Sequence, residues 1–367
     1  MSSTLRIIVL VLLASGLASC SKKEEQSASR SFYMGVTPWP ADFTIPELSK
    51  AYQFINDHCD IVSQHLDDGI PYQEFFSGGI LPAEFLHDIN TRVNNTPPGK
   101  KVLLSVSALN LTRKEKAVYY GKSTTPDSIK SSWEGLSFND PKVITAYTNY
   151  MNWLIDQFKP LYVNYGVESN LLTWDPARFA VYKDFLAAVY ANLKSAHPNT
   201  IFFLSFMVDE SIEGLNFAKQ LLPYTDWIGL SSYPYINIST SANGNTDPSK
   251  FPINYFERYI ELDATKPFAF AETGYLAENL DVLNKLGNEN WQADYLKRVF
   301  ALSEQYKATL VIWFCSKDYD AGNNTLKQLG LYQTLFGFWE DTGLIDENDR
   351  PRPAFGIWKN WLNKRKD

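Results

Sequence analysis

Several residue types and motifs that mark common classes of protein are scarce or missing in this sequence. The 367 residues include 3 Cys and 4 His, and they show no Cys/His spacing of the zinc-binding kind. No G-x-G-x-x-G follows an apolar run and there is no P-loop, so nothing indicates a nucleotide. The formal net charge is -7 and there is no basic stripe, which argues against nucleic acid as a partner. We therefore expect no metal, no organic cofactor and no nucleic acid.

The cysteines are too few to form a disulfide framework. Apart from Cys20, only Cys59 and Cys315 are present. An exported protein allows a bridge between these two, but a single pair defines no framework. We expect both to be small buried apolar side chains, as free cysteines commonly are.

The N-terminus has the arrangement of an export signal. Arg6 precedes "IIVLVLLASGLA", an apolar run that is too short to cross a membrane and fits a signal peptide. The run ends in "LASC", which resembles a bacterial lipobox, so residues 1–19 are predicted to be removed and Cys20 to be lipidated. The alternative is an ordinary signal peptide with a chance cysteine. Residues 20–31 are predicted to be the lipidated cysteine and a flexible tether, since the stretch is polar.

The residue after this cysteine bears on where the exported protein goes. Ser21 follows Cys20, and no Asp stands there. By analogy this favours the outer membrane if the host is Gram-negative. We expect a lipoprotein anchored to the outer membrane or cell surface, with membrane lipid as one partner. The face of the membrane stays open.

Apolar segments of strand length recur along the rest of the chain, and most of them lack a polar alternate face. They are "FYMGVTP" (32–38), "CDIVSQHL" (59–66), "KVLLSVSA" (101–108), "LYVNYGVE" (161–168), "TIFFLSFM" (200–207), "DWIGLSSY" (226–233), "PFAFAE" (267–272) and "ATLVIWFC" (308–315). Such segments are typical of parallel strands buried on both faces. Helical patterns lie between them. Two of these, 140–158 and 175–196, open with Asp-Pro, an N-cap followed by Pro at the first helical position.

Alternating strands and helices predict the fold. Eight such units in one chain predict an α/β protein with a single (β/α)₈ TIM barrel over residues 32–367. The connections into the predicted strands are short, whereas the long connections, 109–139, 234–253 and 316–340, lead out of strands. In a barrel the outgoing loops build the C-terminal face, where active sites sit. A doubly wound sheet is the main alternative.

Two glutamates stand at the ends of predicted strands. Glu168 closes "LYVNYGVE", and Glu272 closes "PFAFAE", which otherwise resembles protein interior. A Glu is seldom fully buried without a partner, and the fourth and seventh strands face each other across a barrel mouth. We expect both carboxyl groups to converge on one cleft, where two carboxylates flanking a bond are what glycosidic cleavage needs. The alternative for each is a structural Glu paired with Lys or Arg.

An ordered set of short motifs resembles the clan A glycoside hydrolases, and most of all glycoside hydrolase family 53, the arabinogalactan endo-β-1,4-galactanases. The matching stretches are "GVTPWPADFT", "HLDDGIPYQEF", "GVESN", "WIGLSSYPYI", "AETGY", "VIWFC" and "EDTGLIDENDRPRPAF", which touch most strands from 33 to 358. The resemblance implies a barrel enzyme that hydrolyses β-linked glycans with retention of configuration, on a galactan-like substrate.

The resemblance also assigns roles to single residues. It makes Glu168 the general acid/base and Glu272 the nucleophile of a double displacement. It makes Tyr233 the tyrosine that hydrogen-bonds the nucleophile, and Trp313 the aromatic floor of the sugar subsite. One position departs from the pattern, because the clan usually has Asn before the acid/base to hold the sugar 2-hydroxyl, and this chain has Val167.

Two asparagines are candidates to replace the missing one. Asn164 shares strand parity with Glu168, and Asn170 lies two residues beyond it. Alternatively the 2-hydroxyl contact is absent, and Val167 then motivates a rival function, a lipoprotein that captures glycans on a glycosidase-like barrel without cleaving them. A barrel enzyme of unrelated chemistry is a third alternative, because a fold alone does not give function.

Further candidates follow the first two predicted strands. His65, Asp67 and Asp68 come at the expected barrel mouth, where they are candidates for sugar contact, against ordinary loop capping and solvation. Trp39 can stack on a sugar ring through its apolar face, against plain packing. In "DYDAGNN" (318–324) the Asp residues alternate as in a calcium loop, but the required Gly and Glu fall out of register, so we expect a turn.

The sequence thus predicts a monomeric, lipid-anchored barrel protein that acts on a polysaccharide or oligosaccharide. The leading function is a retaining glycoside hydrolase without metal or cofactor. The alternative is a non-catalytic glycan-binding lipoprotein.

Overall fold

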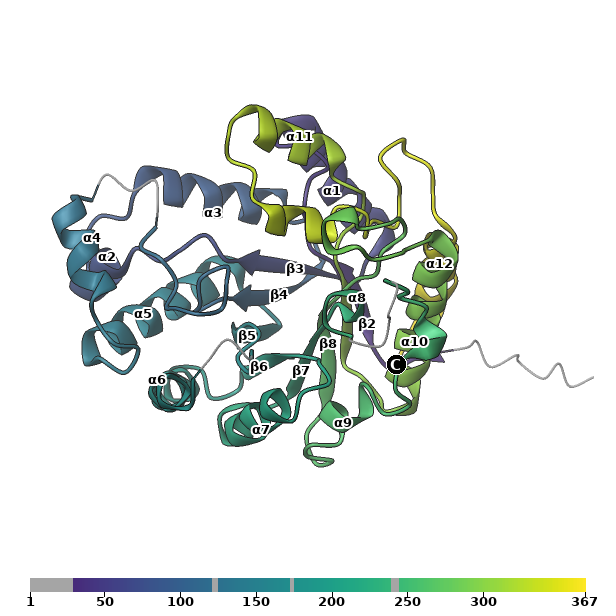
Figure 1. The fold of residues 1–367 in the computed structure, drawn as a ribbon. Coiled ribbons are helices and arrows are strands. Elements are labelled where there is room, and N and C mark those ends of the chain that lie inside the picture. Colours follow the sequence, from purple (N-terminus) through teal and green to yellow (C-terminus); the bar gives the residue numbers. More distant parts are fainter. Residues whose placement is uncertain (1–28, 121–124, 172–174, 239–243) are drawn as a thin grey trace, which may run out of the picture.

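The computed structural model confirms the predicted (β/α)₈ barrel (Figure 1). It describes residues 29–120, 125–171, 175–238 and 244–367. All eight barrel strands are parallel and close in chain order, with the last pairing to the first. They are β2 (Tyr33–Val36), β3 (Ile61–Leu66), β4 (Lys101–Val106), β5 (Tyr162–Gly166), β6 (Ile201–Met207), β7 (Ile228–Ser232), β8 (Phe268–Thr273) and β9 (Leu310–Trp313). Seven of them lie inside the predicted apolar segments, and β8 extends one residue beyond its segment, to Thr273.

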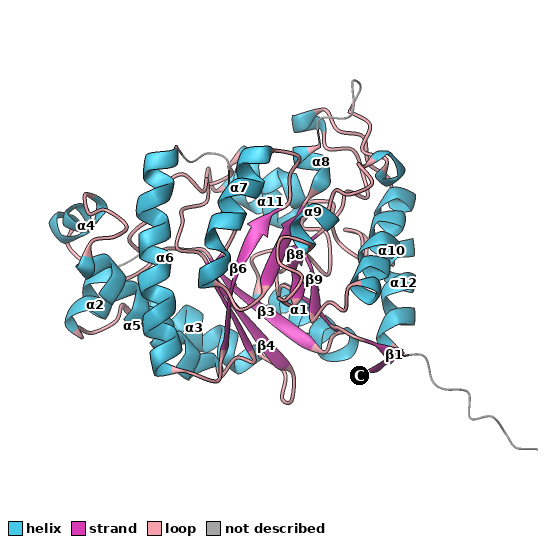
Figure 2. Cartoon of the chain, turned by 90° about the horizontal axis from the view of Figure 1, so that it is seen from below, coloured by secondary structure: helices cyan, strands magenta, loops and turns pink. Residues whose placement is uncertain are grey.

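Helices surround this barrel (Figure 2). They are α1 (Ile45–His58), α2 (Tyr72–Ser77), α3 (Ala83–Asn95), α4 (Asp127–Glu134), α5 (Pro141–Phe158), α6 (Pro176–Ala196), α7 (Ile212–Leu221), α8 (Pro234–Asn237), α9 (Glu257–Ile260), α10 (Glu289–Gln305), α11 (Asp320–Gln328) and α12 (Pro353–Leu362). The two predicted Asp-Pro starts are confirmed, since Asp140 accepts a hydrogen bond from Lys142 N and Asp175 from Arg178 N, both at 2.8 Å. Among the residues that the structure describes, none of the helices has the length and apolar character to cross a bilayer.

The structure confirms the prediction for the two cysteines and contradicts the prediction for the segment 318–324. Cys59 and Cys315 are both buried and free, as expected. The segment 318–324 does not form the expected turn, because α11 begins at Asp320. Asp318 is not free to act as a loop ligand, since it is fully buried in an ion pair with Arg352.

The barrel interior changes character along its axis. At the N-terminal ends of the strands, here called the foot, it is apolar, and its buried side chains are Ile61, Leu103, Phe203, Trp227, Ala269, Ala271, Leu310 and Ile312. Above them lies a polar layer, in which the Asn164 amide donates to Ser105 Oγ at 3.0 Å and to Ser205 Oγ at 3.1 Å. These small side chains satisfy one another, and they leave room for larger groups at the carboxyl ends of the strands, here called the mouth.

The described chain starts with a short parallel pair at the foot. Ser29 and Arg30 form β1, which pairs with β10 (Arg365–Lys366); we call this pair the clasp. Arg30 is buried, its Nη1 lies 2.8 Å from Asp60 Oδ2, and its Nε donates to Trp361 O at 3.1 Å. The predicted tether, which ran to residue 31, is therefore too long at its end, because a buried guanidinium with these partners holds the chain from residue 29 onward.

We expect the Arg30 ion pair to contribute measurably to stability. Removing one member of a buried ion pair leaves the other uncompensated, so Arg30→Ala should lower the free energy of unfolding by about 3 kcal/mol. Urea denaturation measures this. Arg365→Ala is the control in the partner strand, because its ion pair with Asp367 is exposed and should matter by less than about 1 kcal/mol. Equal losses in the two variants would show that the clasp does not depend on the buried charge.

Candidate active site

Glu272 points into the mouth although it follows an apolar strand. The pairing register of β8 shifts on both sides, between Leu230 and Ser231 of β7 and between Phe270 and Thr273 toward β9. Such irregularities re-aim a side chain at the end of a strand. The Glu272 side chain is 18% exposed, and both oxygens have partners.

Two donors hold the Glu272 carboxylate. Tyr233 OH donates to Oε1 at 2.6 Å, and His65 Nδ1 lies 3.0 Å from Oε2. His65 comes from β3, and Tyr233 directly follows β7. Three strands of the barrel therefore meet at this carboxylate, and the predicted contact between Tyr233 and Glu272 is present.

The environment favours a charged pair between His65 and Glu272. Burial acts to raise the pKa of Glu272, but the charge and hydrogen bond of His65 and the hydrogen bond of Tyr233 outweigh it and lower that pKa. Burial acts to lower the pKa of His65, but Glu272 and Asp67 raise it to about 10. Burial, and then the charge of Glu272, raises the pKa of Tyr233, so the phenol keeps the proton that it donates. At neutral pH the geometry thus presents an ionised carboxylate, as a nucleophile requires.

Glu168 lies on the opposite side of the mouth, in the turn after β5. The sequence predicted that Glu168 is the last residue of the strand. The strand instead ends at Gly166, after a register shift toward β6, so Glu168 lies two residues beyond it. Its φ of 52° is in the left-handed region, which is uncommon for a residue other than Gly. Its backbone N donates to Ser205 Oγ at 3.1 Å, and its Oε1 accepts from Ser231 Oγ at 2.8 Å.

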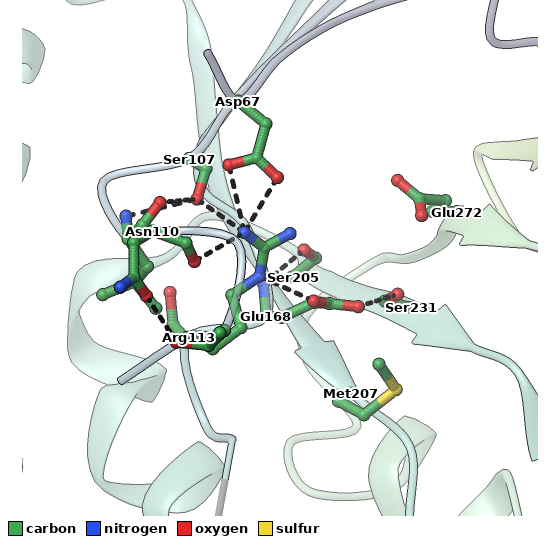
Figure 3. A network of polar contacts seen from close by, with 12 residues as sticks. Asp67, Ser107, Asn110, Arg113, Glu168, Ser205, Met207, Ser231 and Glu272 are labelled. Atoms are coloured by element: carbon green, nitrogen blue, oxygen red, sulfur yellow. Dashed lines mark hydrogen bonds and ion pairs between the residues drawn. The ribbon is translucent and has the colours of Figure 1, made fainter. Parts of the chain in front are cut away.

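Arg113 is the functional candidate that sequence reasoning missed. It comes from the loop after β4, and Figure 3 shows its guanidinium between Asp67 and Glu168. Nε donates to Glu168 Oε2 at 2.8 Å, and Nη1 donates to Asp67 Oδ2 at 2.9 Å and Oδ1 at 3.1 Å. It is the single Arg of the long loop 109–139. That was the available signal, because Arg is the side chain suited to bridging carboxylates.

Arg113 and Asp67 stabilise each other's charge. Burial acts to lower the pKa of Arg113, but the charges of Asp67 and Glu168 raise it overall. Burial acts to raise the pKa of Asp67, but Arg113 and His65 lower it. Asp67 was predicted as a sugar contact, and the structure places it between two cations.

Asp68, the neighbouring candidate, lies outside this group. Its side chain is 70% exposed and its carboxylate is 3.6 Å from Arg92 of α3. It turns away from the glutamates, because successive residues leaving a strand point to opposite sides. The prediction of Asp68 as a site residue is therefore corrected.

Neither asparagine candidate is available to a sugar. Asn164 is used within the polar layer of the barrel. Asn170 is fully buried, where its amide donates to Met207 O at 3.0 Å and accepts from Met207 N at 2.7 Å. A buried amide must find such partners inside the protein, so both residues are structural, and neither replaces the Asn that Val167 displaces.

The predicted aromatic floor is also displaced by one residue. Trp313 is fully buried in the core between barrel and helices, and its Nε1 donates to Thr342 O at 2.8 Å. Phe314, the next residue, is half-buried and lies 5.9 Å from Trp39, measured between ring centroids. Trp39 also contacts Tyr319 at 5.8 Å. Phe314 and Trp39, not Trp313, therefore form an aromatic wall beside β9.

A second aromatic surface lies near Tyr233. Trp339 is half-buried and its ring centroid is 5.6 Å from that of Tyr233. In contrast, Tyr119, Tyr120 and Trp133 of the long loop after β4 are buried, so they pack within the protein. Cys20, the predicted lipidation site, lies outside the described residues.

A group of acids apart from the two glutamates has the spacing for a cation. Asp318, Asp320 and Asp341 each offer a carboxylate oxygen within 4.8 Å of the others. Burial, followed by the neighbouring charges of Asp320, Glu278 and Glu340, raises the pKa of Asp341 to about 7. Asp318 is already paired with Arg352, whereas Asp320 Oδ2 is buried without a hydrogen-bond partner among the described residues. We assign no metal to this group.

Comparisons with known proteins connect the barrel with glycoside hydrolases through structure. No family model and no curated protein matches the chain. Among solved structures, an exo-β-1,4-mannosidase from Opitutaceae bacterium strain TAV5 is 16% identical with a TM-score of 0.61, over 92% of this chain and 59% of that one. The chain thus spans well under two thirds of the mannosidase. GH5_18 from Streptomyces cattleya, in complex with GlcNAc, is 14% identical with a TM-score of 0.60, over 91% and 80%.

A family 53 structure is also among the structural neighbours. The GH53 catalytic domain from Ignisphaera aggregans is 16% identical with a TM-score of 0.60, over 90% of this chain and 96% of that one. The structural neighbours are thus clan A glycoside hydrolases, with family 53 among them. At these identities the likeness establishes the shared fold.

We expect the charge of His65 to depend on Glu272. In Glu272→Gln the main favourable charge is lost while the burial remains, so the pKa of His65 should fall from about 10 by about one to three units. NMR titration of the imidazole carbon-bound protons measures this, and His65→Gln assigns the signal among the 4 His. Asp68→Asn removes an exposed carboxylate close by in the sequence and should leave the value in place. An unchanged His65 pKa in Glu272→Gln would contradict the ion pair.

Proposed function

We propose that this protein is a retaining glycoside hydrolase that cleaves β-linked glycans. The observation that carries the proposal is a pair of glutamates in one barrel mouth with different surroundings. Glu272 faces His65 and Tyr233, which favour its charged form, and Glu168 stands on the turn after β5. Two carboxyl groups with distinct roles are what this chemistry requires.

The reaction proceeds in two displacements. Glu272 attacks the anomeric carbon and forms a glycosyl ester, while Glu168 gives its proton to the leaving oxygen. Glu168 then takes a proton from water, which attacks the same carbon and releases Glu272. Tyr233 donates to Glu272 throughout, and this hydrogen bond holds the attacking oxygen in a fixed position.

The substrate class follows from resemblance and from the aromatic surfaces. The motifs resemble the galactanases of family 53, so we propose a galactan-like, β-1,4-linked glycan. Trp39 and Phe314 on one side and Trp339 on the other offer half-buried rings on which sugar faces can stack. The names of three neighbours, an exo-β-1,4-mannosidase and two endo-β-1,4-xylanases, support a β-linked substrate without selecting one.

One observation favours the rival function, a glycan-binding lipoprotein without turnover. Both oxygens of Glu168 accept hydrogen bonds, one from Ser231 and one from the Arg113 guanidinium. A general acid must carry a proton on one of these oxygens, so Glu168 has to leave Arg113 before it can act. Val167, in the place of the usual Asn, points the same way. The retaining hydrolase remains the leading proposal because the surroundings of Glu272 fit a nucleophile.

Reducing-end release on a glycan panel tests the leading function. We expect the wild-type protein to release new ends from at least one of β-1,4-galactan, arabinogalactan, mannan, xylan or β-glucan. Glu272→Gln should lose activity by about a thousandfold or more, because it removes the nucleophile, while glycan binding persists.

Glu261→Gln is the matched control, since it neutralises an exposed glutamate in the loop before β8. Binding without release by the wild type would support the capture protein. Release that survives in Glu272→Gln would contradict the assignment of the nucleophile.

We further propose that the chain is exported and lipidated on Cys20, as its "LASC" motif indicates. Expression in a Gram-negative host with radiolabelled palmitate should label the wild-type protein and place it in the membrane fraction. Cys20→Ser should abolish the label and release the protein into the soluble fraction. Cys59→Ser is the control at a buried cysteine. Label that is retained in Cys20→Ser would contradict the proposal.

A further inference from the structure

The two glutamates are joined by a continuous chain of alternating charges. Glu272 faces His65 at 3.0 Å, and His65 Nε2 lies 3.8 Å from Asp67 Oδ2. Asp67 pairs with Arg113 at 2.9 Å, and Arg113 pairs with Glu168 at 2.8 Å. Each of these five side chains is at most 18% exposed, so solvent screens the contacts only weakly.

The three inner members of the chain, His65, Asp67 and Arg113, each contact two oppositely charged neighbours. Arg113 holds two carboxylates with different nitrogens, Nε for Glu168 and Nη1 for Asp67. Asp67 in turn is shared by His65 and Arg113. Arg113 and Asp67 each lie between two partners, so a shift of either group toward one partner lengthens its distance to the other and weakens that attraction.

We propose that Arg113 is a positioning residue that couples Glu168 to Glu272 through Asp67 and His65, so that the charge of one glutamate sets the state of the other. Its role in turnover rests on the proposed hydrolase function, whereas the coupling itself does not. None of the sequence motifs assigned a function to Arg113, and its own φ of 57° places it in the left-handed region. A strained backbone at a site is a reason to look for a function.

The direction of the coupling suits two-step hydrolysis. While Glu272 is a carboxylate, His65 pairs with it and interacts less with Asp67. Asp67 then pairs more closely with Arg113, and the ion pair between Arg113 and Glu168 becomes weaker. Glu168 can then carry the proton for the leaving group. When Glu272 becomes the glycosyl ester its charge is gone, and His65 turns to Asp67. Arg113 then pairs with Glu168 and holds it in the charged form that activates water.

Other charged groups around the chain must be considered as alternative causes. Tyr233, after β7, donates to Glu272, and Tyr182 of α6 lies close enough to Arg113 for its pKa to be affected by it. Ser231 of β7 donates to Glu168. The charges of Glu168 and Arg113 also act on His65 directly through space. An experiment must therefore separate coupling along the chain from a general field.

The pKa of His65, read by NMR in the full chain without any ligand, reports the state of the chain. Glu168→Gln frees Arg113 to take Asp67 entirely, so the His65 pKa should fall by about half a unit, less than for a direct partner. Asp67→Asn should lower it further, because a direct partner is lost. Arg113→Gln should raise it, because Asp67 then serves His65 alone.

A double-mutant cycle distinguishes the chain from a field. In the Asp67→Asn background, Glu168→Gln should no longer move the His65 pKa, because the link is cut. A shift as large as in the wild type would overturn the proposal. The cycle uses only Asp67→Asn and Glu168→Gln, which both preserve the shape of the side chain. It can therefore be measured even if Arg113→Gln does not fold. Two controls, Asp68→Asn and Lys114→Gln, remove an exposed acid and an exposed cation beside the chain and should leave the pKa unchanged.

The turnover role has its own readout. On a glycan that the wild type cleaves, Asp67→Asn should move both limbs of the pH profile of kcat/KM, because one chain governs both glutamates. Arg113→Lys, which keeps a charge but lacks the two-nitrogen fork, should restore less than half of the activity lost in Arg113→Gln. Movement of a single limb, or full rescue by Lys, would overturn it. If no glycan is cleaved, the proposed function fails while the ligand-free cycle still decides the coupling.

Discussion

A carboxylate removed from water must find a counter-charge or a set of hydrogen-bond donors, and the mouth of this barrel encloses three of them. Uncompensated, each would cost several kcal/mol, a large part of the stability of a typical domain. Glu272, Asp67 and Glu168 are instead matched by His65 and Arg113. The pairing brings together side chains from β3, β8, the turn after β5 and the loop after β4.

The barrel beneath supports this arrangement in two stages. Apolar side chains fill the foot, where no polar group has to be satisfied. Above them, Ser105, Asn164 and Ser205 bond to one another, and Ser205 also accepts from the backbone of Glu168. The polar layer thus forms the transition from a dry interior to a charged mouth, and it fixes the turn on which Glu168 stands. A base of this kind holds the side chains of the mouth in fixed positions.

Much of this could be predicted from the sequence, because its signals are local. Uninterrupted apolar segments gave the eight strands, Asp-Pro gave two helix starts, and Glu272 with Tyr233 and His65 could be placed at strand ends. What failed depends on non-local geometry. Strand parity made Asn164 a site candidate, but its amide is used by Ser105 and Ser205 inside the barrel. The family resemblance made Trp313 the aromatic floor, but its ring lies in the core and its Nε1 donates to Thr342 O. Arg113 meets Glu168 across 55 positions of sequence, and no local pattern records such a pair.

The clasp determines how the barrel would be oriented relative to the membrane if Cys20 carries a lipid. The described chain begins at the foot, the end of the barrel opposite the glutamates, and Arg30 fixes it there. Cys20 stands nine positions before Ser29, a stretch that can span at most about 30 Å when fully extended. With a lipid on that cysteine, the foot is kept near the bilayer and the mouth opens away from it. A polymer too large to enter the headgroup region would then meet the glutamates from the surrounding medium, end-on to the barrel axis.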